Sequence, residues 1–272
     1  MSEQTAPSSS IKIPSYVADL AIDSADTLVS IIPRRKPSPT QRQATQVISH
    51  RGQRDDKTVF ENTFSAFDSL VDSTVAGIEF DIRWTKDLIP MVAHDSNLVR
   101  LFGDETVIAE ATFFELRSAH PQIATLSEFV ERYASRFFLT IELKQELWLD
   151  FEAQQDVLLG CLKNLKAGAD YIVMSFDIEL LQQLDKVDNR CKLGIAHSNV
   201  ADVSDVVLQN GWAGIGGHYL MISTATIKRH KAAGQRIAIG FPKSKFSAYR
   251  EVKRGTDWLF CDDALQVCKW LG

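Results

Sequence analysis

Short apolar runs recur along the chain from Gln46 onward, and segments with helical spacing separate them. Runs of four to eight residues bounded by turn residues are typical of strands that are buried in a sheet. Eight such strands are predicted: Val47–His50, Ile78–Ile82, Phe138–Leu143, Tyr171–Ser175, Lys192–Ala196, Ala213–Gly217, Arg236–Gly240 and Trp258–Cys261.

Amphipathic segments with a helical period lie between these strands. Examples are Asn62–Val75, Leu126–Ala134, Phe151–Lys166, Ser223–Ala233 and Lys245–Arg254. Eight strands that alternate with helices over roughly 250 residues favour a closed barrel over an open sheet. The sequence therefore predicts an α/β protein with the (β/α)8 fold of a TIM barrel.

The second predicted strand begins a hairpin. Apolar residues alternate over Ile78–Ile82, so Glu79 and Asp81 share the opposite face of the strand. A second apolar run, Ile89–Ala93, follows after a short turn and ends at His94. A parallel crossover needs about a dozen residues, so this second run is expected to return antiparallel to the first.

The pattern also predicts how the chain is divided. Residues 46–272 are expected to form the barrel domain, with residues of about 85–123 as a small insertion after the second strand. Residues 1–45 are expected to hold a polar tail, an extra amphipathic helix at Tyr16–Ile32 and a linker rich in proline and serine. The helix is interpreted as a cap across the bottom of the barrel or as a segment that binds a partner or an anionic lipid surface.

Composition and charge limit the classes of function. The net charge of −5 and the pI near 5.7 argue against nucleic acid as the main partner, because no global basic field would attract phosphate backbones. The four cysteines form no CxxC pair, which favours reduced thiols in a cytoplasmic location. We find no apolar run of the ~20 residues that a membrane span needs and no secretion signal.

Acidic side chains lie on two neighbouring strands of the predicted barrel. Glu79 and Asp81 lie on the second strand, and Glu142 and Lys144 lie on one face at the end of the third. Three carboxylates beside one lysine leave a negative field that a divalent cation with oxygen ligands, Mg²⁺ or Ca²⁺, would neutralise. Zinc is disfavoured because no cysteine joins the group. These carboxylates are the candidate metal ligands, and no organic cofactor is expected.

Two histidines and two cations complete a candidate catalytic site. His50 and Arg51 end the first strand, and His94 ends the hairpin. Arg51 and Lys144 would bind an anionic group such as phosphate, the arginine as a fork and the lysine as a point charge. His50 and His94 would exchange protons in the attack on a phosphodiester. Each residue alone has a structural explanation, such as a histidine at a barrel rim; their occurrence together favours chemistry.

The chain resembles the glycerophosphodiester phosphodiesterases from about Val47 to its end. The resemblance lies in these motifs: His50-Arg51-Gly52, Glu61-Asn62-Thr63, Gly77-Ile78-Glu79-Phe80-Asp81, Thr85-Lys86-Asp87, His94-Asp95, Leu98, Arg100, Glu142-Leu143-Lys144 and Ser175-Phe176. Two stretches depart from the family pattern: Ile239–Lys243 and Phe260–Asp263.

The resemblance implies a TIM barrel with a small insertion and a role for each candidate residue. It implies metal binding by Glu79, Asp81 and Glu142, and phosphate contacts by Arg51 and Lys144. It implies that His50 is the proton acceptor or nucleophile and that His94 gives a proton to the leaving alcohol. Substrates such as glycerophosphocholine or glycerophosphoethanolamine would yield glycerol 3-phosphate and an alcohol, by direct water attack or through a cyclic phosphate.

Two alternatives stay open beside this hydrolase. One is a lyase-type, phospholipase D-like enzyme that releases a cyclic phosphate from choline-bearing phospholipids. The other is a barrel without catalysis that binds phosphate ligands at a membrane surface through Tyr16–Lys36. The expected partner of the hydrolase is a small-molecule glycerophosphodiester substrate, with at most a peripheral membrane contact through Tyr16–Lys36.

Overall fold

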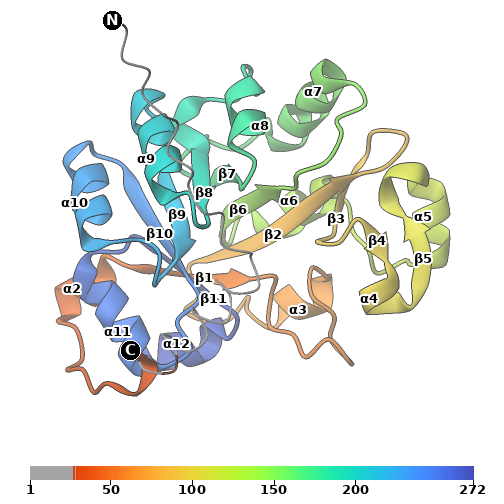
Figure 1. The fold of residues 1–272 in the computed structure, drawn as a ribbon. Coiled ribbons are helices and arrows are strands. Elements are labelled where there is room, and N and C mark those ends of the chain that lie inside the picture. Colours follow the sequence, from red (N-terminus) through yellow and green to blue (C-terminus); the bar gives the residue numbers. More distant parts are fainter. Residues whose placement is uncertain (1–26, 28) are drawn as a thin grey trace, which may run out of the picture.

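The chain forms a closed barrel of eight parallel strands, as the computed structural model of residue 27 and residues 29–272 shows (Figure 1). The barrel strands are β1 (Gln46–His50), β2 (Gly77–Trp84), β6 (Phe138–Leu143), β7 (Tyr171–Ser175), β8 (Lys192–Ala196), β9 (Gly214–His218), β10 (Arg236–Gly240) and β11 (Trp258–Cys261). Strand β1 pairs in parallel with both β2 and β11, and this pairing closes the barrel. The predicted TIM barrel is therefore confirmed.

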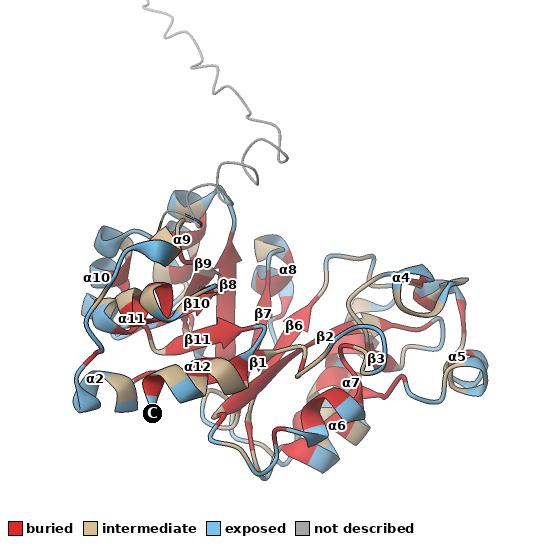
Figure 2. Cartoon of the chain, turned by 90° about the horizontal axis from the view of Figure 1, so that it is seen from below, coloured by how far each residue is buried: buried red, intermediate tan, exposed pale blue. Residues whose placement is uncertain are grey.

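The strands are buried, and the outer faces of the surrounding helices are exposed (Figure 2). The helices that follow the barrel strands are α3 (Phe64–Asp68), α6 (Leu126–Tyr133), α7 (Phe151–Leu162), α8 (Ile178–Gln183), α9 (Val200–Gln209), α10 (Thr224–Ala232), α11 (Lys245–Arg254) and α12 (Ala264–Leu271), with a 3-10 turn η2 (Asn189–Cys191) before β8. Their apolar side chains and the outward side chains of the strands form one continuous core. Burial of these two surfaces against each other is the main favourable term in folding.

The first helix is shorter than predicted. The sequence pattern indicated Asn62–Val75, whereas α3 covers only Phe64–Asp68. Polar side chains satisfy the backbone beyond it: the Ser73 hydroxyl donates to the Leu70 carbonyl at 2.6 Å, and Arg136 donates to two further carbonyls of this segment. The Ser73 bond is local and competes with the helical backbone bonds, and the Arg136 bonds come from a residue distant in sequence. Together these bonds end the helix early.

The hairpin and the insertion are present as predicted. Strand β3 (Pro90–Val92) runs antiparallel to β2, with Ile82 opposite Val92. The remaining elements of the insertion are β4 (Asn97–Leu98), α4 (Val99–Phe102), β5 (Asp104–Val107), η1 (Ile108–Glu110) and α5 (Phe113–Ala119). They enclose a small apolar core of their own and lie to one side of the barrel (Figure 1).

The segment before the barrel contacts the C-terminus. Helix α2 (Pro39–Gln43) begins at Ser38, whose side chain accepts a hydrogen bond from the backbone of Gln41. Lys36 donates to the Gly272 carbonyl at 2.6 Å. The amphipathic helix expected at Tyr16–Ile32 lies outside the described residues, except for residue 27 and residues 29–32. Within the described part of the chain, every helix is too short or too polar to cross a bilayer.

Gly214 in β9 allows a close approach of two strands. An added Cβ would lie 2.0 Å from the carbonyl oxygen of Arg236, a backbone atom that cannot move aside. We expect Gly214→Ala to lower the free energy of unfolding by about 1–3 kcal/mol or more, because overpacked cores must distort. Urea denaturation measures this change.

Gly160 provides the matched control. It lies in the exposed part of α7, and an added Cβ would meet no atom within 4 Å. Gly160→Ala is expected to raise the free energy of unfolding by roughly 0.5–1 kcal/mol, because alanine loses less conformational entropy in a helix. Equal effects of the two substitutions would contradict the steric argument.

Candidate active site

The end of β1 makes a tight turn that directs His50 into the barrel mouth. Arg51 and Gly52 both have positive φ angles, of 57° and 84°. A Cβ on Gly52 would lie 2.6 Å from the Ala66 side chain, so only glycine fits this turn. The Arg51 amide donates to the Glu79 carbonyl at 2.9 Å, which joins the turn to β2.

The register of β2 and β6 brings the three predicted carboxylates together. Asp81 lies directly beside Glu142 in the parallel pairing, and Glu79 lies beside His50 of β1. Glu79, Asp81 and Glu142 are all buried, and each offers an oxygen within 4.8 Å of the others. This cluster could hold a metal ion.

Asp81 is surrounded by positive charge. Lys144 Nζ lies 2.9 Å from Asp81 Oδ1, and Arg51 Nε lies 3.2 Å from Oδ2. Asn62 Nδ2 donates to Oδ2 at 2.9 Å. Burial by itself would raise the pKa of Asp81, but Lys144 and Arg51 together hold that pKa well below its ordinary value. Asp81 is therefore ionised throughout the neutral range.

For Glu79 and Glu142, the nearby positive charges do not offset the effects of burial and of the neighbouring carboxylates. Burial and then the charge of Asp81 raise the pKa of Glu79 well above its ordinary value, and the same two causes raise the pKa of Glu142 to about 7. Both carboxylate oxygens of Glu79 are buried without a hydrogen-bond partner among the described residues. Buried, unpaired carboxylate oxygens are costly unless a cation binds them, so these residues fit a divalent ion.

His50 has a carboxylate partner that the sequence analysis did not identify. Its Nδ1 lies 2.8 Å from Asp262 Oδ1 at the end of β11, and its Nε2 lies 3.8 Å from Glu79 Oε2. Burial lowers the pKa of His50, and the hydrogen bond that His50 donates to Asp262 opposes this shift. Asp262 was noted only as part of a stretch that departs from the family pattern. The position of Asp262 directly after the eighth predicted strand could have marked it as a residue of the active-site face.

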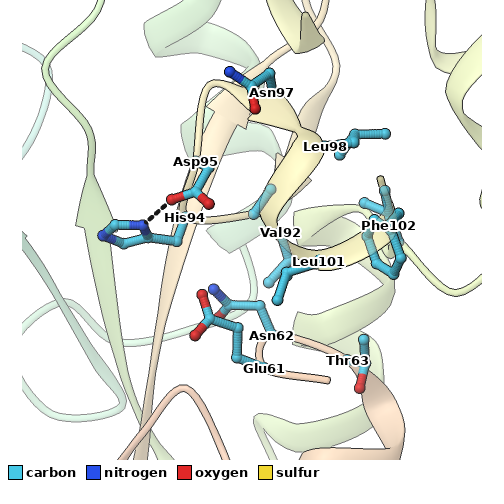
Figure 3. A pocket seen from close by; sticks show the side chains of 12 residues that line it. Glu61, Asn62, Thr63, Val92, His94, Asp95, Asn97, Leu98, Leu101 and Phe102 are labelled. Atoms are coloured by element: carbon cyan, nitrogen blue, oxygen red, sulfur yellow. Dashed lines mark hydrogen bonds and ion pairs between the residues drawn. The ribbon is translucent and has the colours of Figure 1, made fainter. Parts of the chain in front are cut away.

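His94 lies at the end of the hairpin, two residues after β3. Its Nδ1 lies 2.6 Å from Asp95 Oδ1, and its carbonyl accepts a hydrogen bond from Arg83 Nε at 3.0 Å. Burial lowers the pKa of His94, whereas the charge of Asp81 acts to raise it. Figure 3 shows His94 and Asp95 beside a small cavity, with Glu61 and Asn62 on the wall below them.

The two predicted phosphate contacts lie at this site and are engaged with its acids. Arg51 contacts Asp81 and Glu61, and Lys144 bridges Asp81 and Glu142, the latter at 2.5 Å. Both side chains are largely buried. They reduce the repulsion among the carboxylates.

Asn62 is the first residue of the helix predicted at Asn62–Val75, but it lies before α3 and does not cap it. Thr63 occupies the N-cap position, and Asn62 has a positive φ of 59°. The left-handed backbone turns the Asn62 amide toward Asp81, and the Asn62 N–H donates to the Arg51 carbonyl at 3.1 Å. Asn62 thus supports both the first-strand turn and the acid cluster.

A cavity of about 400 Å³ opens from these residues across the barrel mouth. His50, Glu79, Glu142 and Asp262 form its charged side. The rest of the lining is mainly apolar and also carries three basic residues. It consists of Met174, Phe176, Ile195, Ala196, His197, Gly217, His218, Met221, Ala238, Gly240, Phe241, Lys243 and Phe260. This volume and this mixture of surfaces are typical of a small-molecule site.

The remaining histidines have structural partners. His120 bonds Asp104 in the insertion at 2.7 Å. His230 is fully buried and bonds Ser204 and Gln235. Neither lines the cavity at the barrel mouth.

Comparison with known proteins identifies relatives of the same fold and of one family. The model of the glycerophosphoryl diester phosphodiesterase family matches residues 50–264. A glycerophosphodiester phosphodiesterase of Caldanaerobacter subterraneus subsp. tengcongensis is 26% identical over 232 residues, which cover 80% of this chain and 94% of that protein. Glycerophosphodiester phosphodiesterase 1 of Mus musculus is 25% identical over 174 residues, covering 57% of this chain and 50% of that one.

Solved structures agree on the fold. The glycerophosphodiester phosphodiesterase of Thermotoga maritima has a TM-score of 0.70 at 24% identity and covers 83% of this chain and 97% of its own. A phosphodiesterase of Oleispira antarctica, solved with the product sn-glycerol-3-phosphate, has a TM-score of 0.72 at 20% identity and covers 83% of this chain and 96% of its own.

Proposed function

The chain belongs to the glycerophosphoryl diester phosphodiesterase family, and from this membership we propose that it hydrolyses glycerophosphodiesters to glycerol 3-phosphate and an alcohol. The observation that carries the proposal is the proximity of two histidines to one buried carboxylate cluster: His50 Nε2 lies 3.8 Å from Glu79 Oε2, and His94 lies close enough to Asp81 for that charge to act on its pKa. The product complex of the Oleispira antarctica phosphodiesterase supports glycerol 3-phosphate as the product. Glycerophosphocholine and glycerophosphoethanolamine are the proposed substrates.

Glu79, Asp81 and Glu142 would hold the divalent cation. The donor atoms are all carboxylate oxygens, which favour Mg²⁺ or Ca²⁺ over softer ions. When bound, such an ion stabilises the negative charge that develops on the phosphoryl oxygens. Arg51 and Lys144, which border the cluster, would contact the same oxygens.

His50 is proposed as the proton acceptor or nucleophile. Asp262 holds its Nδ1, which leaves Nε2 free to accept a proton at the cavity. The lowered pKa of His50, caused mainly by burial, keeps the ring neutral near pH 7, as a base requires.

His94 is proposed as the proton donor to the leaving alcohol. Its Nδ1 bonds Asp95, and this carboxylate stabilises the ring when it carries the proton that Nε2 gives up. An alkoxide is a poor leaving group, so protonation of its oxygen lowers the barrier to cleavage.

The other expectations from the sequence are kept as proposals. Residues 46–272 would act as the catalytic domain, and residues 1–45 would form a separate N-terminal segment. We propose a cytoplasmic location, with Tyr16–Lys36 as the candidate for a peripheral membrane contact.

Product analysis tests the proposed function. We expect the full-length protein with Mg²⁺ or Ca²⁺ to convert glycerophosphocholine or glycerophosphoethanolamine to glycerol 3-phosphate, followed by phosphorus NMR. A cyclic phosphate as the final product would instead indicate the lyase route. No reaction with any glycerophosphodiester would contradict the proposal.

A further inference from the structure

A chain of ion pairs begins at the Nδ1 atom of His50. Asp262 Oδ1 lies 2.8 Å from this nitrogen and 3.2 Å from Arg54 Nη2. Arg54 Nε lies 3.3 Å from Glu61 Oε2, and Arg54 Nη1 donates to the His50 carbonyl at 2.6 Å. Asp262 and Arg54 thus connect the imidazole of His50 to the carboxylate of Glu61.

A second series of ion pairs joins the Glu61 carboxylate to His94. Asp95 Oδ1 lies 2.6 Å from His94 Nδ1, and Asp95 Oδ2 accepts from Arg100 Nε at 2.6 Å. Arg100 Nη2 then donates to Glu61 Oε1. In Figure 3 the Glu61 carboxylate lies on the wall below His94 and Asp95. The two histidines therefore share one distant anchor.

Glu61 is the only acid of this network that is deeply buried. The Glu61 side chain is 2% exposed, whereas the acids that bond the two histidines are more exposed, Asp262 at 60% and Asp95 at 27%. Exposed ion pairs alone contribute about 0–1 kcal/mol and hold their side chains weakly. A buried carboxylate that binds several guanidinium groups through charge-assisted bonds is more rigid.

The geometry of Glu61 is itself set by the loop that carries it. Its amide donates to Asp56 Oδ1 at 3.0 Å, and the next residue, Asn62, bonds Asp81 in the acid cluster. The anchor is therefore tied to the same part of the site that would bind the phosphate.

We propose that Glu61 is a positioning residue that orients both His50 and His94, through Arg54 and Arg100 respectively. The inference rests on the proposed function, because it assigns proton transfer to these two histidines. Glu61 does not border the charged side of the main cavity, so it acts through the arginines.

Two substrates separate the two arms of the network. An alkyl diester of glycerol 3-phosphate needs a proton on its leaving oxygen, whereas the 4-nitrophenyl diester releases a stable phenolate and does not. We expect Arg100→Gln to lower kcat for the alkyl diester about tenfold and to leave kcat for the nitrophenyl diester within about twofold of wild type. Arg54→Gln is expected to lower both by about tenfold, because proton acceptance by His50 serves both substrates.

Glu61→Gln removes the shared charge while it keeps the size of the side chain. We expect kcat for the alkyl diester to fall by about 10–100-fold with KM within about twofold of wild type. Its effect should not multiply with those of Arg54→Gln and Arg100→Gln, because all three act on the same contacts. Arg190→Gln is the control, since Arg190 is 83% exposed and pairs with Asp188, outside the network.

Nitrogen NMR of the imidazole rings gives a readout that does not depend on activity. The His50 and His94 resonances should both shift in Glu61→Gln at fixed pH, and only His94 should shift in Arg100→Gln. A folded Glu61→Gln with wild-type kcat, or equal losses on both substrates in Arg100→Gln, would overturn the proposal. If Glu61→Gln does not fold, the two arginine variants decide. If the wild type hydrolyses neither diester, the proposed function fails while the NMR shifts still test the network.

Discussion

Replacement of His50 by alanine is expected to lower kcat by roughly 10²–10⁴, and His94→Ala is expected to have an effect of the same order. His50 Nε2 lies 3.8 Å from the acid cluster and faces the cavity, and its Nδ1 is held by Asp262. Without either imidazole the substrate has no group positioned to accept or to give the proton. Steady-state kinetics with glycerophosphocholine, with release of glycerol 3-phosphate as the readout, measure the loss.

His120→Ala is the matched control for both substitutions. His120 also bonds a carboxylate, Asp104, and its ring lies tilted against Phe102, but it lines neither the main cavity nor the small cavity beside His94. Its kcat should remain near that of the wild type. Wild-type turnover in a folded His50→Ala or His94→Ala protein would remove that histidine from the catalytic pair.

Removal of divalent ions is expected to abolish hydrolysis, and added Mg²⁺ or Ca²⁺ should restore it. The physical reason is the uncompensated charge of the buried cluster, in which Glu79 has no hydrogen-bond partner among the described residues. A ligand that binds only the folded protein also raises Tm, by an amount that grows with its concentration. We therefore expect Tm to rise with added metal. Full activity in excess chelator would exclude a metal-dependent mechanism.

The effect of Glu79→Gln on Tm, relative to the wild type, should differ between chelator and added metal. Burial and the neighbouring carboxylates raise the pKa of Glu79, so its ionised form opposes folding when no cation is bound. A neutral side chain of the same size is expected to raise Tm in chelator by about 2–4 °C per kcal/mol relieved. Added metal should raise the Tm of the variant only slightly, in contrast to the wild type, and the variant should show no turnover.

Glu251→Gln is the control for the metal experiment. Glu251 is also fully buried, but it pairs with Arg250 and Arg254, and none of these three residues belongs to the cluster. Its substitution should lower Tm equally with and without metal, because it leaves arginine charge unpaired. A metal-dependent change in this variant would contradict the assignment of the binding site.

The metal-free protein should also lose stability as the pH rises through the neutral range. The pKa of Glu142 is raised from 4.5 to about 7 by burial and by Asp81. Between these values the unfolded chain has released a proton that the folded chain keeps, so increasing pH favours unfolding. Thermal denaturation in chelator from pH 4.5 to 8 measures this contribution, and Glu142→Gln should remove it.

The strands were predictable because their signal is local. Short apolar runs between turn residues marked all eight barrel strands, and alternation in β2 placed Glu79 and Asp81 on the inner face. The return of the hairpin followed from the length of its turn. Helix α3 was less predictable, because the bonds that end it come partly from Arg136, which is distant in sequence.

Sequence by itself determined the barrel, its insertion and the kinds of residue at the strand ends, since each depends on periodicity and on motifs within short stretches. Only the tertiary structure decided how the side chains are paired. Closure of β11 against β1 brings Asp262 to His50, and the turn after β1 brings Arg54 to Glu61. Such partners depend on register and backbone direction across the whole fold, and no local pattern encodes them.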